Sequence, residues 1–123
     1  DDRKERMTIR HLLTMTTGLD WHENLPFTDP RNSGMVMEAE ADWVSYAVGR
    51  PMSDEPGVRF NYNSGATILL AHIFQSVTGQ DLEEYAAKHL FAPLGIANYF
   101  WKRTPHGLPD TEGGLYLEPR DLA

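Results

Sequence analysis

The chain has 123 residues, of which 41% are hydrophobic and 24% are charged, a composition that fits one globular domain at most. Its formal net charge of −7, with basic residues scattered among acids, argues against a nucleic-acid partner, because no basic run could neutralise phosphates. The lack of cysteine excludes disulfides and thiolate metal sites, and no apolar run approaches the length of a membrane span.

The first predicted element is a short helix. Thr8 is a suitable N-cap, the helix is expected to run to about Thr16, and Gly18 stands just past its end. Residues 21–33 carry proline and asparagine turn signals and are expected to form a loop. The side chains expected to face inward from this helix are Ile9, Leu12 and Leu13.

A second helix is predicted over residues 38–48. Gly49 and Pro51 should end it, and a turn-rich connection over residues 52–57 should follow. The side chains expected to face inward are Trp43, Val44, Ala47 and Val48. Trp21, in the preceding loop, is either a core residue or the edge of a cleft.

The segment from Pro56 to Val77 is the most informative part of the sequence. A Pro-Gly turn leads into a polar stretch around Tyr62, and an amphipathic helix follows until Gly79. The side chains expected to face inward are Ala66, Leu69, Leu70, Ile73, Phe74 and Val77. Tyr62 stands where the loop becomes the helix, so it is either a functional group that solvent can reach or a ring that covers the core, its hydroxyl bonded to a backbone carbonyl.

The last third of the chain predicts one helix and little else that is regular. Asp81 and Glu84 form a capping-box-like pair for a helix through about Phe91, which Pro93 and Gly95 end. Its expected inward side chains are Leu82, Tyr85, Ala86 and Leu90. Residues 97–101 are expected to be extended, residues 102–114 to form a polar loop, and Pro119 to begin a further helix. The predicted fold class is therefore mainly α.

The histidines do not indicate a metal centre. Their spacings match no metal-binding motif, and the His22-Glu23 pair lacks the second histidine of H-E-x-x-H. The five histidines are His11, His22, His72, His89 and His106. We predict no metal and no cofactor.

Four segments, in order, resemble motifs of one family. They begin at Met7 (M-T-I-R-H-L-L-T-M-T-T-G-L-D), at Pro56 (P-G-V-R-F-N-Y-N-S-G), at Val77 (V-T-G-Q-D-L-E-E-Y-A-A-K-H-L-F-A-P-L-G-I) and at Gly113 (G-G-L-Y-L-E-P-R-D-L-A). They resemble the serine β-lactamase and penicillin-binding-protein-like hydrolases, and their details lean toward the class C β-lactamase-related esterases and the aminohexanoate-dimer hydrolases. The resemblance implies that residues 1–123 are a partial domain, mostly the helical lobe of a β-lactamase/transpeptidase-like α/β fold.

The resemblance also implies a catalytic role for Tyr62. In the family this tyrosine lies beside a nucleophilic serine and its lysine, whose ammonium favours the phenolate and lets it relay the serine proton. The nucleophile belongs to an S-x-x-K motif upstream of the Met7 segment, and none of the five serines here has a lysine three residues on. The late K-T-G or H-x-G strand is also absent. We therefore expect an internal fragment that is inactive by itself.

The substrate-binding residues that the resemblance implies are Asn63, Ser64, Gly113 and Gly114. Ser64 stands where many relatives have asparagine, and its hydroxyl lacks the carbonyl and amide donor pair, which favours an esterase or amidase over a strong β-lactamase. Ser64 could equally be the N-cap of the following helix, with Asn63 taking over part of the binding role. For the two glycines the alternative is a tight backbone turn.

Two functions remain open at this point. The first is a parent serine hydrolase that forms an acyl-enzyme with a small-molecule ester, amide or β-lactam. The second is a non-catalytic member of the fold that binds a ligand or a partner. Helix faces left uncovered in the fragment predict self-association. Family members are often exported, so the resemblance favours the periplasm or cell envelope.

Overall fold

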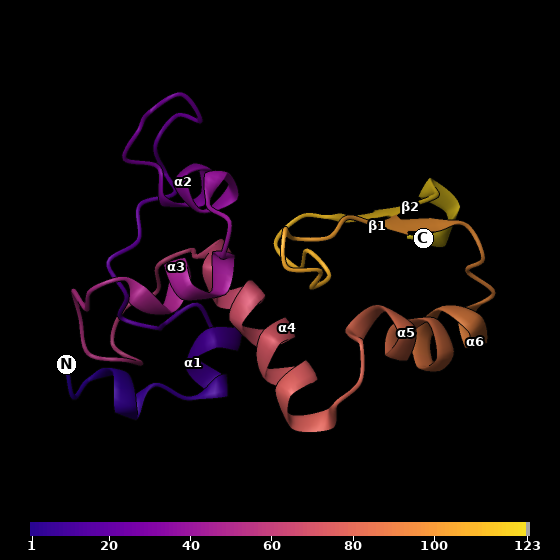
Figure 1. Ribbon diagram of the computed structural model, residues 1–123, viewed down its shortest axis with the longest axis horizontal. Coiled ribbons are helices and arrows are strands. Elements are labelled where there is room, and N and C mark those ends of the chain that lie inside the picture. The colour runs from indigo at the N-terminus through magenta and orange to yellow at the C-terminus, as the bar shows by residue number, and fades with distance from the viewer. Residues whose placement is uncertain (123) are drawn as a thin grey trace. The chain divides into compact units, whose positions relative to one another are not determined.

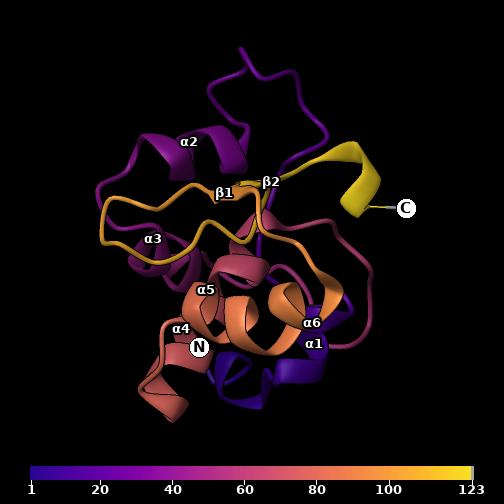
Figure 2. The ribbon, with the colours of Figure 1, turned by 90° about the vertical axis from the view of Figure 1, so that its right-hand side faces the viewer.

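The structure is a computed structural model that describes residues 1–122. It comprises two compact units, Asp1–Leu70 and a second that begins at Ala71, and helix α4 (Ser64–Thr78) contributes residues to both. Figures 1 and 2 show the elements of each unit. Most of these elements are helices, which confirms the predicted mainly α class.

The N-terminal helix is shorter than predicted. Helix α1 (Ile9–Leu13) begins where expected, because the Thr8 side chain accepts a hydrogen bond from the His11 amide at 3.4 Å. It ends before Thr16, since the chain turns at Met15, whose φ is +55°. A helix of five residues makes less than one and a half turns and presents one residue, Leu12, to the core. The expectation that Ile9 and Leu13 face inward is wrong, because both side chains are more than half exposed.

The helix predicted over residues 38–48 is in fact two helices, α2 (Ser33–Ala39) and α3 (Trp43–Gly49). Asn32 caps α2 and Asp42 caps α3, each through its side-chain oxygen. Asp42 has an extended backbone, so the helix must restart after it. Val48, expected to be inward, is 46% exposed; Trp43 and Ala47 are buried as predicted.

Trp21 lies in the core of the first unit. Its ring is 2% exposed and meets Tyr46 edge-on, with 5.9 Å between the ring centroids. A Cβ at Gly65 would lie 2.8 Å from the Trp21 ring and 2.9 Å from the Ala47 Cβ, so only glycine lets the start of α4 pack this closely. The apolar core comprises Leu12, Leu19, Trp21, Met37, Trp43, Ala47, Met52, Ala66, Ile68 and Leu69.

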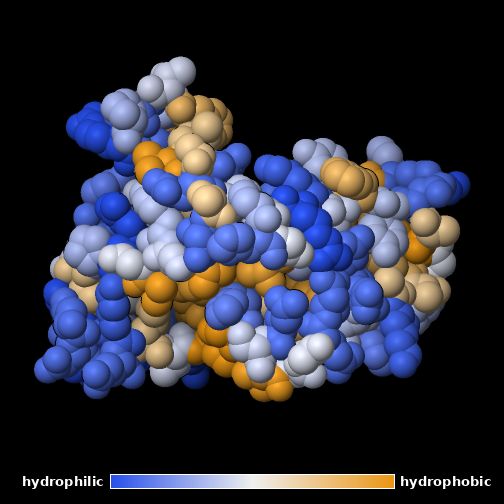
Figure 3. Space-filling view, viewed as in Figure 1, coloured by the Kyte–Doolittle hydropathy of each residue, from blue (hydrophilic) through white to orange (hydrophobic). Residues whose placement is uncertain are grey.

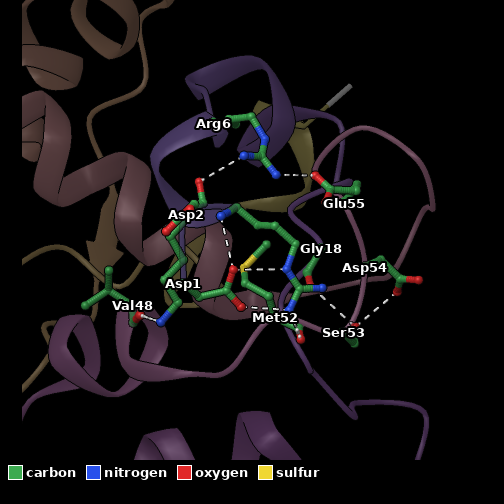
Figure 4. A network of polar contacts seen from close by, with 11 residues as sticks. Asp1, Asp2, Arg6, Gly18, Val48, Met52, Ser53, Asp54 and Glu55 are labelled. Atoms are coloured by element: carbon green, nitrogen blue, oxygen red, sulfur yellow. Dashed lines mark hydrogen bonds and ion pairs between the residues drawn. The ribbon is translucent and has the colours of Figure 1, made fainter.

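A network of polar contacts ties the N-terminal segment to the chain that leads toward α4 (Figure 4). The Arg3 guanidinium donates to the Met52 carbonyl at 2.9 Å, and the Lys4 ammonium donates to the Val48 carbonyl at 2.7 Å. The Gly18 carbonyl accepts the amides of residues 53 and 54. Asp2 takes part through its backbone carbonyl, to which the Arg6 guanidinium donates at 3.4 Å. The remaining side chains of this network belong to Asp1, Arg6, Ser53, Asp54 and Glu55. These contacts fix the path of residues 52–57 across the first unit.

Helix α4 is packed in its first half and exposed at its end. Ala66 and Leu69 are buried as predicted, and so are Ile68 and Ala71. The inward placement predicted for Val77 is wrong, since its side chain is 80% exposed. Within residues 1–122, no helix has both the length and the apolar character needed to cross a membrane.

The second unit places a helical segment beneath a two-stranded hairpin. Helix α5 (Leu82–Ala86) continues through a π-helical turn (Ala87–Phe91) into α6 (Ala92–Leu94). Strand β1 (Tyr99–Trp101) pairs antiparallel with β2 (Leu115–Leu117). The extended segment predicted at 97–101 is confirmed by β1, and a short 3-10 turn (Pro119–Asp121) begins at the proline expected to start a helix.

The π-helical turn changes which side chain faces the core. It adds one residue to the turn, which rotates the following side chains relative to a regular α-helix. Leu90 is therefore 51% exposed, contrary to the prediction, while Phe91 is buried. The Phe91 ring lies 4.6 Å from the Tyr99 ring and 6.3 Å from that of Trp101, which joins the helical segment to β1.

Candidate functional site

Tyr62 lies two residues before α4 and points its ring partly into solvent. The residue is 50% exposed, and within residues 1–122 its hydroxyl has no hydrogen-bond partner. The structural alternative, a hydroxyl held by a backbone carbonyl, is thus not seen in the described part of the chain. The phenol is therefore available to a ligand.

The backbone on the N-terminal side of Tyr62 is held by two hydrogen bonds from Asn61. Its amide donates to the Met15 carbonyl at 2.8 Å, and its Nδ2 donates to the Trp21 carbonyl, also at 2.8 Å. Because Trp21 is a core residue, Asn61 connects the site directly to the packed interior of the first unit.

Asn63 is the N-cap of α4. Its Oδ1 accepts a hydrogen bond from the Ala66 amide at 3.0 Å, and the residue is completely buried. The capping role considered for Ser64 is therefore wrong, since Ser64 is already the first residue of the helix. The Asn63 Nδ2 has no partner within residues 1–122. Substrate binding by Asn63 and Ser64 stays a prediction.

Glu23 is the residue that sequence reasoning missed. Its carboxylate accepts the Ser64 amide at 2.9 Å, the Trp21 indole N–H at 2.7 Å and, at very close range, the Ser64 hydroxyl. A carboxylate at the start of a 15-residue helix also interacts favourably with the helix dipole. Glu23 and Ser64 are 41 residues apart, and no local motif links them.

The two glycines predicted for substrate binding lie in the second unit, in the turn before β2. They line a pocket of about 240 Å³ together with Trp101 and residues 110–112. A Cβ at Gly114 would lie 2.5 Å from the Asp110 Cβ, whereas one at Gly113 would meet open space. Gly114 therefore needs to be glycine for a tight turn, and substrate binding by either glycine stays a prediction.

The structure thus gathers Tyr62, Asn63 and Ser64 at one place in the first unit, whereas Gly113 and Gly114 belong to the second unit. The first three are consecutive residues on a scaffold made by Asn61 and Glu23.

A second pocket in the first unit, of about 420 Å³, is lined by His22, Arg31 and Arg50 among others. Asp20 contacts His22 at 3.0 Å and Arg50 at 3.4 Å, and Arg31 pairs with Asp29 at 2.7 Å. The hydrogen bond from Arg31 lowers the pKa of Asp29 to about 2. Acidic side chains thus pair with both arginines and contact His22. Within residues 1–122, no group of three or more histidine, aspartate or glutamate side chains is arranged to hold a metal ion.

Comparison with known proteins gives a match over the whole described chain. The sequence profile of the family described as Beta-lactamase matches residues 1–122. Monacolin J acid methylbutanoyltransferase of Aspergillus terreus is 32% identical over 103 residues, which are 82% of this chain and 24% of that protein. ML-236A carboxylate methylbutanoyltransferase of Penicillium citrinum is 33% identical over the same length, again 82% of this chain and 24% of the relative.

A solved structure shares the fold. The penicillin binding protein from Bacillus halodurans aligns with a TM-score of 0.66 and 24% identity, covering 99% of this chain and 45% of that one. At this identity the likeness shows the fold alone. The chain spans about a quarter of the length of the two curated relatives.

Proposed function

The chain belongs to the beta-lactamase family, and we propose that in the whole protein it supplies Tyr62 as the proton-transfer group of a serine hydrolase or acyltransferase. Membership of the family suggests a function of that general kind. One observation carries the proposal: a half-exposed phenol, without a hydrogen-bond partner in the described part of the chain, stands on a backbone that is fixed on both sides.

The chemistry is acyl transfer in two steps. The serine hydroxyl attacks the carbonyl carbon, its proton passes to the tyrosine oxygen, and the same oxygen then protonates the leaving group. Water or an alcohol next attacks the acyl-enzyme and gives its proton back along the same route. A free phenol titrates near pH 10, so the relay needs a neighbouring cation, which the family's S-x-x-K lysine would provide.

The expected substrates are small-molecule acyl donors, namely esters, amides or β-lactams. Two relatives are named as methylbutanoyltransferases, and this supports transfer of the acyl group to an acceptor other than water. The serine at position 64 favours esters and linear amides over β-lactams, because its hydroxyl cannot offer the carbonyl and amide pair of an asparagine.

The test is the Tyr62→Phe variant of the whole protein, assayed for acylation by a chromogenic ester in a stopped-flow instrument. We expect the acylation rate to fall by about 10²–10⁴, the usual contribution of a positioned acid–base group, with a smaller change in KM. Tyr116→Phe is the matched control, because Tyr116 is also exposed but lies on β2. Unaltered turnover of Tyr62→Phe would contradict the proposal and show that Tyr62 has a structural role only.

The chain of 123 residues by itself should form no acyl-enzyme. None of its serines belongs to an S-x-x-K motif, and loss of the nucleophile removes several orders of magnitude of rate. Incubation with a fluorescent penicillin and with the chromogenic ester should give neither labelling nor turnover. Stoichiometric acylation of one of its serines would contradict the assignment.

A further inference from the structure

We propose that Glu23 is the positioning residue of the site: by holding the first residue of α4, its carboxylate sets the place of the Tyr62 phenol. This inference rests on the proposed function, since it concerns the same tyrosine. Glu23 itself does not need to touch the substrate.

One short stretch of chain holds Tyr62 from both sides. The Trp21 carbonyl accepts a hydrogen bond from Asn61, one residue before the tyrosine. The Glu23 carboxylate accepts two from Ser64, two residues after it. The indole of Trp21 donates to that same carboxylate at 2.7 Å, so the two holding points are themselves connected.

The position of Glu23 is fixed independently of Tyr62. A Cβ at Gly34 would lie 3.0 Å from the Glu23 Oε1, so the backbone of α2 packs directly against the carboxylate. On its other side Glu23 meets the buried indole of Trp21 and the nearly buried Ser64. The carboxylate is therefore a rigid part of the first unit.

Tyr62 depends on this arrangement, because its own side chain has no hydrogen bond within residues 1–122 that could hold it. The hydrogen bonds that fix its place are therefore those of the flanking backbone at Asn61 and Ser64. A proton relay works only when donor and acceptor are held at hydrogen-bond distance, and a misplacement of about 1 Å can cost 10²-fold in rate.

Two substitutions at Glu23 separate positioning from general stability. Glu23→Ala removes the acceptor for all three donors, so kcat of the whole protein should fall by about 10- to 100-fold while KM changes little. Glu23→Gln keeps one oxygen for the two N–H donors, and its amide can donate to the Ser64 hydroxyl. Glu23→Gln should therefore retain most of the rate, and an equally severe loss in both variants would overturn the proposal.

Asp42 offers a matched control within the same unit. Its carboxylate makes the same kinds of contact at the start of α3, accepting the Ser45 amide at 2.9 Å and the Ser45 hydroxyl at 2.6 Å. Asp42→Ala should lower the melting temperature and leave kcat unchanged. If it lowers kcat as much as Glu23→Ala does, the effect is one of general stability and the proposal fails.

A double substitution distinguishes this proposal from the proposed function. In the Tyr62→Phe background, Glu23→Ala should lower kcat no further, because the group that it positions is gone, while its effect on the melting temperature should persist. If Glu23→Ala lowers kcat equally in both backgrounds, Glu23 does not act through Tyr62. If Tyr62→Phe alone leaves kcat unchanged, the proposed function fails first, and that result is read from the single variant.

Discussion

Helices α4 and α5 both begin at a carboxylate, but the two carboxylates differ in their separation along the sequence from the helix that they contact. At α5 the carboxylate belongs to Asp81, the residue directly before the helix, which accepts the amides of residues 83 and 84. Arg103 then pairs with Asp81 at 2.5 Å. At α4 the local cap is the uncharged Asn63, and the carboxylate arrives from Glu23, 41 residues earlier than Ser64.

The two carboxylates join different parts of the chain to the helices. The cap of α5 is local, and its ion pair with Arg103 joins the helix to the loop before β2. The contact at α4 instead joins the loop at residues 21–23 to a helix start that carries Tyr62, a half-exposed side chain without a hydrogen bond in residues 1–122. A structural cap stabilises its own helix, whereas the long-range contact also determines where Tyr62 stands.

The largest expected effect on stability is at Gly65, where α4 meets the core of the first unit. A Cβ there would lie 2.8 Å from Trp21 and 2.9 Å from Ala47, so Gly65→Ala should destabilise by about 1–3 kcal/mol through overpacking. Gly49→Ala in α3 is the control, because a Cβ there meets nothing within 4 Å. Urea unfolding of the 123-residue chain measures both. Equal midpoints for the two variants would show that α4 is not packed tightly on Trp21.

The next effect concerns the local cap of the second unit. Asp81→Ala removes the acceptor for two helix amides and one of the two carboxylate partners of Arg103, the other being Glu83, and should cost about 0.5–2 kcal/mol. Arg103→Ala leaves the cap in place and should cost less, about 0.2–1 kcal/mol, since the pair is partly exposed. Chemical denaturation followed by far-UV circular dichroism compares the two. A larger loss for Arg103→Ala would mean that the ion pair, not the cap, stabilises α5.

A smaller effect is expected in acid. The hydrogen bond from Arg103 lowers the pKa of Asp81 below its ordinary value of 3.8. A lowered folded-state pKa means that Asp81 contributes stability above pH 3.8, and that this contribution is lost as the pH falls below that value. Thermal melts between pH 5 and pH 2 should show this loss of stability in the wild type, and a smaller loss in Arg103→Ala. Identical pH dependence in both proteins would show that Arg103 does not lower the pKa of Asp81.

The weakest expected effect is self-association of the 123-residue chain, which we propose from its exposed apolar side chains. Hydrophobic residues reach the surface in Figure 3, and Val58 and Phe60 are 74% and 66% exposed. Sedimentation velocity over a concentration series should show an apparent mass that rises with concentration, and Phe60→Ser should reduce the rise. A monomer mass at every concentration would contradict this prediction.

Much of the local structure could be predicted because its signals are local. Thr8 and Asp81 are side-chain caps that lie next to the helices they begin, and both are confirmed. The extended segment before residue 102 is confirmed as β1. The family resemblance, which rests on four motifs in order, is confirmed by the match over residues 1–122.

The features that were missed depend on packing or on distant residues. The helix restarts after Asp42, and a π-helical turn buries Phe91 instead of Leu90. Both features change which side chains face the core, but neither changes the hydrophobic pattern of the sequence. Glu23 has no sequence signal for its role, because its partner Ser64 becomes a neighbour only when the chain folds.

The central claim is that one carboxylate from residues 21–23 organises the start of α4, and NMR of the 15N-labelled chain tests it most directly. The Trp21 indole N–H and the Ser64 amide both donate to Glu23, so Glu23→Ala should shift both proton resonances upfield and speed the exchange of both protons with solvent. Asp42→Ala, which removes the carboxylate at the start of α3, should leave both unchanged. Unchanged Trp21 and Ser64 resonances in Glu23→Ala, or equal changes in Asp42→Ala, would contradict the account.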